Sequence, residues 1–368
     1  MLYHCGDESA HDRRAGTPAG RTLQDLSILS ERIVIIKGAY VNFQQELQTA
    51  LLAVRKASTL CASVQFSLIT SDTLEKKDRS PVTIADFGSQ AVVSSILADS
   101  FADDPLVGEE DSQDLEQNPD MLDKVFSLVR EQIPGINKEN MLHAIARGAV
   151  EPDYHGRYWT LDPIDGTKGF LRKEQYAVAL ALIEDGEVKL GVLGCPNLPL
   201  DFSDPEKGYG CILYAVRGEG AFMCDMQGEN STAIHADGNV DSSTARFVES
   251  VESAHSAHFV HAKISAALGI TSEPLRIDSQ CKYAAVGRGD VSIYLRYPKD
   301  DVYREKIWDH AAGLIVVEEA GGRVTDIFGE PLNFTLGRTL RENRGVVATN
   351  GALHDHIISI ISELQQSR

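Results

Sequence analysis

The chain has 368 residues, of which 43% are hydrophobic and 24% charged, and its formal net charge is −19. A chain of this length can bury a large core, in one domain or in two closely packed halves. The negative charge argues against a nucleic-acid polymer as partner, because phosphate contacts dominate such binding. No apolar run reaches membrane-spanning length, so we expect no membrane partner.

The cysteines predict a reducing compartment. They stand at positions 5, 61, 195, 211, 224 and 281, and no two have the C-x-x-C spacing of a zinc or redox site. Buried free thiols in the cytoplasm are the expectation. Residues 1–40 are polar and aperiodic, so we expect a disordered extension. Its arginines leave an organelle presequence open, although its acidic residues weaken that interpretation.

Hydrophobic periodicity predicts two helices and a strand before the centre of the chain. Residues 43–70 have helical spacing of apolar positions, and Ser80–Asp86 leads into a second helix over 86–100. Leu106–Asp111 reads as a short strand that ends in acids. Residues 111–140 are acidic and irregular, with a helix expected at 119–132.

Beyond the centre, strands come first and mixed elements follow. Tyr176–Ile183 and Val188–Leu193 are β-rich, and Asp185-Gly186 between them predicts a hairpin turn. A polar loop is expected over 225–243 and a boundary near 245. We therefore predict an N-terminal α+β half over 41–245 and a C-terminal α/β half over 246–368. The elements expected around and after this boundary are strands at 211–216, 220–223, 275–278, 291–296 and 323–326, and helices at 258–268, 309–320 and 352–364.

The most informative stretch is Trp159–Phe170. It contains Asp162 and Asp165, separated by a stiff proline and followed by Gly166 and Thr167. Carboxylate oxygens are hard ligands that suit Mg²⁺, and the threonine hydroxyl can hydrogen-bond a water. If a helix begins here, its free N–H groups also favour a phosphate. An Asp-rich turn without a ligand is the alternative.

Five acids stand at the ends of predicted elements, and they are Asp86, Glu109, Asp162, Asp165 and Asp309. If they converge, they repel one another unless multivalent cations neutralise them. Mg²⁺ ions there would activate a water and screen the charge that develops in phosphoryl transfer. For each acid taken alone, a surface or capping role remains open.

The motifs around these acids resemble those of a known family. Val107–Glu110, Asp162–Thr167 and Trp308–Gly313 are similar to signatures of the lithium-sensitive, Mg²⁺-dependent phosphatases. That superfamily includes inositol monophosphatases, inositol polyphosphate 1-phosphatases and 3′(2′),5′-bisphosphate nucleotidases. The match is closest to the fungal and plant nucleotidases, over 161–172, 194–198, 278–283 and 305–313, within a resemblance that covers 43–365. It implies a layered α/β sandwich of the sugar-phosphatase type, with α/β/α/β/α layers.

The resemblance also implies roles for individual residues. Glu109, Asp162 and the backbone carbonyl of Ile164 would hold one Mg²⁺, and Asp162, Asp165 and Asp309 a second. Asp86 with Thr167 would activate the attacking water, for a total of two or three ions. The residues implied to contact the substrate are Thr167, His255, Ser279, Lys282 and Arg296. For Lys282 and Arg296, an ordinary ion pair is the alternative.

The expected reaction is hydrolysis of the 3′-phosphate of adenosine 3′,5′-bisphosphate to AMP and phosphate. By resemblance, 3′-phosphoadenylyl sulfate is a second substrate and Li⁺ an inhibitor, and we expect the enzyme to be a monomer. Two other functions stay open: an inositol phosphate phosphatase, and a catalytically silent module that binds metal or nucleotide.

Several histidines are tempting as metal ligands. His255, His258 and His261 recur every three residues, but this spacing drifts around a helix and no partner ligand matches it, so we do not expect zinc. His310 adjoins Asp309, and we expect it to pack rather than to bind a metal.

Overall fold

The computed structural model describes residues 42–68, 80–251, 258–298, 300 and 302–366. All of them belong to one compact unit, residues 37–368. The predicted disorder of residues 1–40 and the predicted contact of His255 lie outside the described residues. None of the helices in the described part of the chain is both long and apolar enough to span a bilayer.

Two sheets form the framework. The first has seven strands in the order β1-β2-β3-β4-β5-β6-β7, antiparallel except for the parallel pair β1 and β2. Its strands are β1 (Leu106–Gly108), β2 (Arg157–Asp165), β3 (Ala177–Glu184), β4 (Glu187–Pro199), β5 (Tyr209–Val216), β6 (Gly220–Asp225) and β7 (Thr232–Ile234).

The second sheet has five strands in the order β11-β12-β10-β8-β9. They are β8 (Phe247–Glu249), β9 (Leu275–Arg276), β10 (Ile293–Arg296), β11 (Arg323–Thr325) and β12 (Val346–Thr349). The predicted boundary near 245 falls between the last strand of the first sheet and the first strand of the second.

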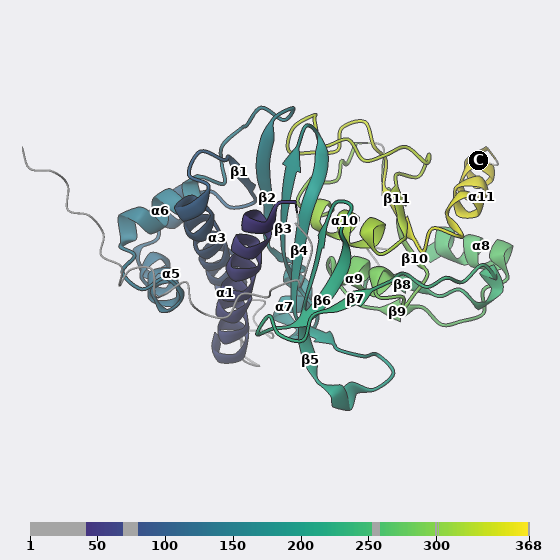
Figure 1. Cartoon of the computed structure of the whole chain (residues 1–368), viewed down its shortest axis with the longest axis horizontal. Helices are drawn as coiled ribbons and strands as arrows, with labels where there is room; N and C mark the ends of the chain where they lie inside the picture. Colours follow the sequence, from purple (N-terminus) through teal and green to yellow (C-terminus); the bar gives the residue numbers. More distant parts are fainter. Residues whose placement is uncertain (1–41, 69–79, 252–257, 299, 301, 367–368) are drawn as a thin grey trace, which may run out of the picture. The chain divides into compact units, whose positions relative to one another are not determined.

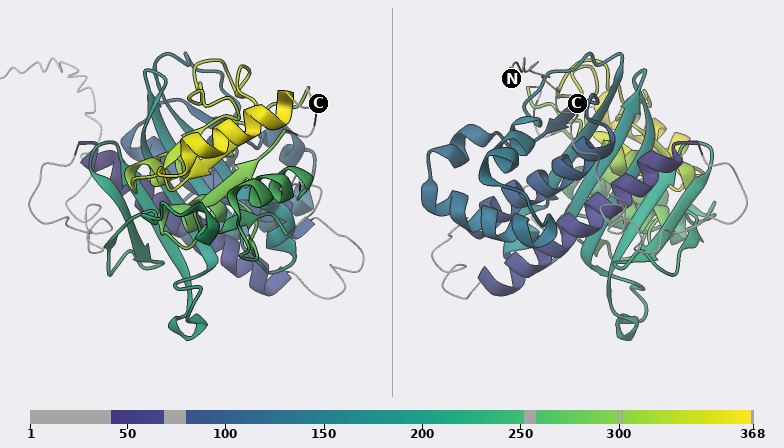
Figure 2. Two further views of the ribbon diagram at one scale, coloured as in Figure 1. Left: turned by 90° about the vertical axis from the view of Figure 1, so that its right-hand side faces the viewer. Right: turned by 60° about the vertical axis from the view of Figure 1, so that its left-hand side comes forward.

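Helices separate and cover the sheets (Figure 1). Helices α1 and α3 pack on one face of the seven-stranded sheet, and α9 and α10 lie between the two sheets. Helices α8 and α11 cover the outer face of the five-stranded sheet, as the left view of Figure 2 shows. The helices are α1 (Gln44–Leu68), α3 (Ser80–Ser100), α4 (Ser112–Glu116), α5 (Pro119–Gln132), α6 (Lys138–Ala146), α7 (Thr167–Leu171), α8 (His258–Leu268), α9 (Cys281–Gly287), α10 (Ala311–Glu319) and α11 (His354–Gln366), with 3-10 turns at Pro205–Lys207 and Ser242–Thr244.

This arrangement confirms the predicted α/β/α/β/α layers. The largest buried cluster joins side chains of the seven-stranded sheet, such as Leu193 and Leu213, to Ile315 and Val316 of α10. Burial of this apolar surface is the main force that holds the layers together. A smaller cluster, with Ile264 and Ile357, lies between the second sheet and its outer helices.

Most predicted elements are present, and several differences have local causes. The β3–β4 hairpin is confirmed, with Asp185 and Gly186 at φ of 54° and 76°, as a tight hairpin turn requires. Helix α3 begins six residues earlier than predicted, because Pro81 occupies the start of a helix, where its missing N–H costs nothing. Asp86 therefore lies inside this helix and not at its end. The loop expected over 225–243 contains strand β7.

Candidate active site

Strand β2 delivers Asp162 and Asp165. Its register against β3 shifts between these two residues, which marks a β-bulge at Pro163 and Ile164. A bulge tolerates the proline, which cannot donate to a ladder, and it re-aims neighbouring side chains. Ser89 of α3 donates a 2.9 Å hydrogen bond to the carbonyl of Pro163 and fixes the bulge from behind. The two acids are thus held at a distorted strand end.

Glu109 follows the parallel neighbour strand β1. Gly108 pairs with Leu161, so Glu109 leaves the sheet beside Asp162. Gln90 of α3 fixes the segment that follows β1. Its side chain accepts from the N–H of Glu110 at 3.0 Å and donates to the Glu110 carbonyl at 2.7 Å. A Cβ at position 108 would lie 2.5 Å from the Gln90 side chain, so a larger residue there would displace the Gln90 amide.

Asp309 reaches the site from the C-terminal half. Helix α10 begins at Ala311, so Asp309 lies just before it and not in its first turn as predicted. Its carboxylate is 3.6 Å from Nη2 of Arg296. Asp309 repels the carboxylates of Glu109, Asp162 and Asp165. These four predicted metal ligands therefore lie in one cluster.

Burial and mutual repulsion raise the pKa values of this cluster. Burial, then Asp309 and the neighbouring acids, raise the pKa of Glu109 to about 7, against an opposing effect of Lys306. Burial and Asp309 raise the pKa of Asp165 to about 6. Burial and then Glu109 raise the pKa of Asp162 well above its usual range. Carboxylates held this close disfavour a second negative charge unless a cation joins them.

One buried oxygen atom of the cluster makes no hydrogen bond within the described part of the chain. Oδ1 of Asp162 is buried and has no hydrogen-bond partner among the described residues. An unpaired buried carboxylate oxygen is costly, and a hard divalent cation would satisfy it. The donor set of carboxylates therefore fits Mg²⁺. The bulge adds a suitable backbone group, since it removes Ile164 from the regular ladder.

A second group of possible ligands overlaps this one. Glu305, Asp309 and His310 each place one ligand-type atom within 4.8 Å of the others. Protein partners already occupy two of them: Glu305 pairs with Arg296 at 2.8 Å, and Nδ1 of His310 lies 2.7 Å from the hydroxyl of Tyr283. The completely buried His310 packs as predicted, with its other ring nitrogen 3.3 Å from Glu305.

The predicted catalytic pair is only partly assembled. Asp86 is buried, and burial, Glu110 and Glu109 raise its pKa well above the usual range. Thr167 is exposed and begins helix α7, which packs against α3. In the described part of the chain no hydrogen bond joins Asp86 to Thr167. The prediction that the two residues act together thus rests on their helices being neighbours.

Lys282 and Arg296 act electrostatically on Asp165, and Gln280, next to Ser279, donates a hydrogen bond to it. Lys282 is 5% exposed, and burial lowers its pKa although Asp165 and Asp278 oppose that effect. Ser279 is buried and holds a positive φ of 64°, which is unusual outside glycine. Arg296 ends strand β10 between Glu305 and Asp309. These side chains bring positive charge to the acidic cluster.

Some neighbours of the site were not predicted. Lys306 reduces the pKa rise of Glu109, and its ammonium lies 5.4 Å from the centre of the Trp308 ring. Arg338 stacks on the same ring at 4.9 Å and donates to the carbonyl of Gly108. Lys306 stands three residues before Asp309, within the stretch 305–313 that resembles the nucleotidases, but nothing in the sequence assigned it a role. Arg338 comes from a distant loop and gave no signal in the sequence.

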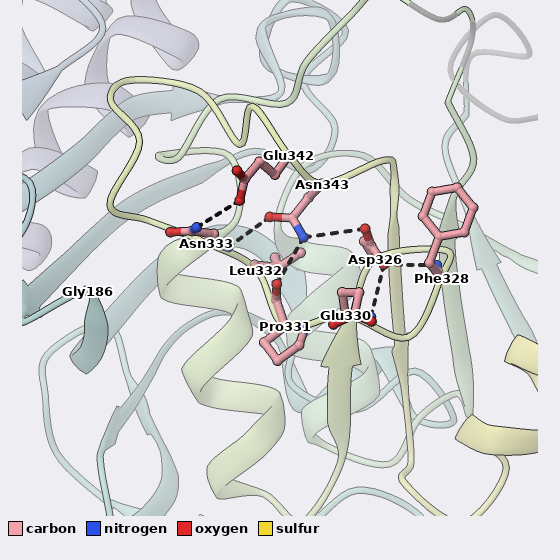
Figure 3. A pocket seen from close by; sticks show the side chains of 9 residues that line it. All are labelled: Gly186, Asp326, Phe328, Glu330, Pro331, Leu332, Asn333, Glu342 and Asn343. Atoms are coloured by element: carbon pink, nitrogen blue, oxygen red, sulfur yellow. Dashed lines mark hydrogen bonds between the residues drawn. The ribbon is translucent and has the colours of Figure 1, made fainter.

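A surface pocket of about 470 Å³ is lined by none of these residues (Figure 3). Asp326 is its most buried acid, and both of its oxygens accept hydrogen bonds, from the N–H groups of Phe328 and Glu330 and from Asn343 and Arg344. The Asp326 carboxylate therefore stabilises the loop that carries it. The pocket is lined by Gly186, Asp326, Phe328, Glu330, Pro331, Leu332, Asn333, Glu342 and Asn343.

Comparisons with known proteins match nearly the whole described chain. The model of the inositol monophosphatase family matches residues 42–366. A 3′(2′),5′-bisphosphate nucleotidase of Schizosaccharomyces pombe is 45% identical over 86% of this chain and 95% of its own length. Proteins of the same name from Dictyostelium discoideum and Oryza sativa are each 43% identical, over 88% and 87% of this chain and 98% and 94% of their own.

Solved structures share the fold. An inositol monophosphatase of Zymomonas mobilis has a TM-score of 0.59 at 20% identity and covers 88% of this chain and 100% of its own. The Thermotoga maritima inositol monophosphatase has a TM-score of 0.56 at 22% identity, covering 88% and 99%. At these identities the likeness concerns the architecture alone.

Proposed function

Because the chain belongs to the inositol monophosphatase family, we propose that it is a Mg²⁺-dependent 3′(2′),5′-bisphosphate nucleotidase. The reaction is hydrolysis of the 3′-phosphate of adenosine 3′,5′-bisphosphate, which yields AMP and phosphate, and 3′-phosphoadenylyl sulfate is a second substrate. The relatives that carry this name are 40% to 45% identical over most of the chain. The observation that carries the proposal is the buried Asp162 oxygen that lacks a partner within a cluster of coupled acids.

The acids would hold the metal ions. Glu109, Asp162 and the carbonyl of Ile164 form one set of ligands, and Asp162, Asp165 and Asp309 form another. When bound, Mg²⁺ supplies Lewis-acid stabilisation of the phosphate charge and lowers the pKa of water. The side chains supply the geometry: the bulge in β2 and the clamp of Gln90 hold three of the carboxylates before any ligand arrives.

Asp86 and Thr167 orient and deprotonate the attacking water. The threonine hydroxyl at the start of α7 orients the water by a hydrogen bond, and Asp86 accepts its proton. Burial, Glu110 and Glu109 raise the pKa of Asp86, which makes its carboxylate a stronger base than an ordinary aspartate. Attack in line with the leaving 3′-oxygen then needs no covalent intermediate with the protein.

The nucleotide is held by cations and a hydroxyl. Lys282 and Arg296 carry positive charge beside Asp165 and Asp309, and Ser279 directly precedes Gln280, whose N–H donates to Asp165. A substrate with two phosphates gains from such donors, whereas an acidic chain otherwise repels it. His255 completes the predicted set. The five described cysteines are buried and free, which supports a cytoplasmic enzyme, and we expect it to act as a monomer.

Product analysis tests the proposal. Purified protein is incubated with adenosine 3′,5′-bisphosphate and Mg²⁺, and the nucleotide product is identified by chromatography. The expected product is 5′-AMP with one equivalent of phosphate, formed only with Mg²⁺ and suppressed by Li⁺. Formation of 3′-AMP, or release that persists after chelation of the metal, would overturn the assignment. Absence of any release would favour a binding module.

A further inference from the structure

Gln280 connects the two halves of the site. Its backbone N–H donates a 2.5 Å hydrogen bond to Oδ2 of Asp165, at the end of β2. Its side-chain amide donates to the carbonyl of Trp308 at 2.9 Å and accepts from the N–H of Gly313 at 2.9 Å. The residue is 1% exposed. One glutamine thus contacts the chain on both sides of Asp309 and also the carboxylate of Asp165.

The side chain replaces a helix cap. His310 is the N-cap residue of α10, and its side chain makes no capping hydrogen bond. The first turn of a helix leaves N–H groups that need partners. Gln280 supplies the partner for Gly313, the third residue of α10, and so caps the helix from another element. The turn that carries Asp309 lies between the two backbone groups that this amide holds.

The segment before Gln280 is packed too tightly to shift freely. Ser279 has a φ of 64°, and Gly166, at a φ of 96°, faces it so closely that a Cβ at 166 would lie 2.9 Å from Cβ of Ser279. Gly166 follows Asp165 directly. The backbone positions of Asp165 and Gln280 are therefore tied together by sterics as well as by the hydrogen bond.

We propose that Gln280 is a positioning residue that sets Asp165 and Asp309 in register, so that carboxylates from strand β2 and from the segment before α10 can share one Mg²⁺. This inference rests on the proposed metal site. Groups that orient metal ligands typically change affinity by about 10-fold to 100-fold when they are removed. A side chain that only filled the core would leave metal affinity unchanged.

The test compares two glutamines in metal titrations. Gln280→Met removes the amide and keeps the length of the side chain. Gln65→Met is the matched control, because the buried amide of Gln65 also donates to a backbone carbonyl, that of Phe170, at 2.9 Å, and accepts from Asn197 at 2.8 Å. Mg²⁺ binding to metal-free protein is measured by calorimetry, together with the melting temperature without metal.

We expect both variants to lose similar stability without metal, since each leaves a buried carbonyl without its donor. Only Gln280→Met should weaken Mg²⁺ binding, by about 10-fold or more. Its kcat should recover when Mg²⁺ is raised to saturation. If Gln280→Met fails to fold, Gln280→Glu, which keeps the acceptor for Gly313, is titrated instead with the same expected loss.

Three results would overturn parts of this account in distinguishable ways. A wild-type protein that binds no Mg²⁺ contradicts the proposed function itself. A wild type that binds Mg²⁺ with the same affinity as Gln280→Met contradicts the role of Gln280 alone. Equal weakening by Gln280→Met and Gln65→Met shows general loosening of the fold and likewise contradicts positioning.

Discussion

Arg296 and Glu305 form an ion pair of 2.8 Å in which the carboxylate is only 6% exposed. Glu305 also faces Nε2 of His310 at 3.3 Å, and His310 meets the hydroxyl of Tyr283 at 2.7 Å. These contacts lower the pKa of Glu305, although burial works against them. The guanidinium is therefore fixed in place before a substrate binds, by contacts of its Nη2 with Glu305, Asp309 and the hydroxyl of Tyr303.

Arg296→Lys should separate the two substrate classes. A lysine ammonium cannot maintain the ion pair with Glu305 and also offer the planar set of N–H donors of a guanidinium. A bound phosphate therefore loses a charged hydrogen bond. We expect kcat/KM for adenosine 3′,5′-bisphosphate to fall by about 10-fold to 100-fold, the cost of one such bond. Hydrolysis of inositol 1-phosphate should change much less. Arg323→Lys, in an exposed ion pair with Asp355, is the control and should alter neither rate. Equal losses on both substrates would refute a nucleotide contact.

Asp162→Asn should lower the activity without lowering the stability of the metal-free protein. The substitution keeps the shape of the side chain and removes a buried charge whose pKa is already raised by burial and by Glu109. Activity should fall by at least about 100-fold, as when a group that stabilises transition-state charge is lost. The metal-free variant should melt no lower than the wild type, and added Mg²⁺ should no longer raise its melting temperature. A variant that keeps the Mg²⁺ response would remove Asp162 from the metal site.

Stabilisation by Mg²⁺ should depend on pH. In the metal-free protein the pKa of Asp165 is raised to about 6 and that of Glu109 to about 7, so their protonated forms favour the folded state. Their contribution is complete below the unfolded pKa near 4 and is lost as the pH rises through these folded values. Mg²⁺ requires the ionised forms, so its effect on the melting temperature should grow from about pH 5 to about pH 8. Melting curves with and without Mg²⁺ measure this, and Glu109→Gln should flatten the trend. An effect of constant size across this range would contradict it.

We expect His354, outside the candidate active site, to make the folding stability fall at acid pH. Burial and the nearby Arg323 lower its pKa to about 4, and its ring lies between the hydroxyls of Thr325 and Thr349, at 2.8 Å and 3.0 Å. The stability that the neutral ring contributes is present above about pH 6.5 and is lost as the pH falls toward about 4. The full change is on the order of 3 kcal/mol. Denaturant titrations across this range should show a steeper pH slope for the wild type than for His354→Asn. Identical slopes would mean that His354 is not the group involved.

Local patterns predicted the parts of the site that lie within one stretch of chain. Asp162, Asp165 and the following turn could be predicted because the two aspartates, the proline between them, Gly166 and Thr167 stand in one short stretch. The five layers followed from resemblance and not from periodicity. Helix α6 could have been found, since Asn137 caps it by accepting from the N–H of Asn140 at 2.8 Å.

The remaining features depend on tertiary contacts. Strands β8 and β12 have three and four residues, too few for a periodic pattern, and each is held by pairing with two neighbouring strands. Gln280 caps a helix more than 30 residues further along the chain, and no spacing rule identifies such a partner. The same holds for Arg338, which donates to Gly108 across 230 residues.

The most direct test of the central claim is the ratio of kcat/KM for adenosine 3′,5′-bisphosphate to that for inositol 1-phosphate, measured side by side with Mg²⁺. The positive charges of Lys282 and Arg296 beside the buried Asp165 predict a strong preference for the nucleotide, with both activities abolished in Asp162→Asn. A preference for the inositol ester would keep the metal chemistry and contradict the nucleotide assignment.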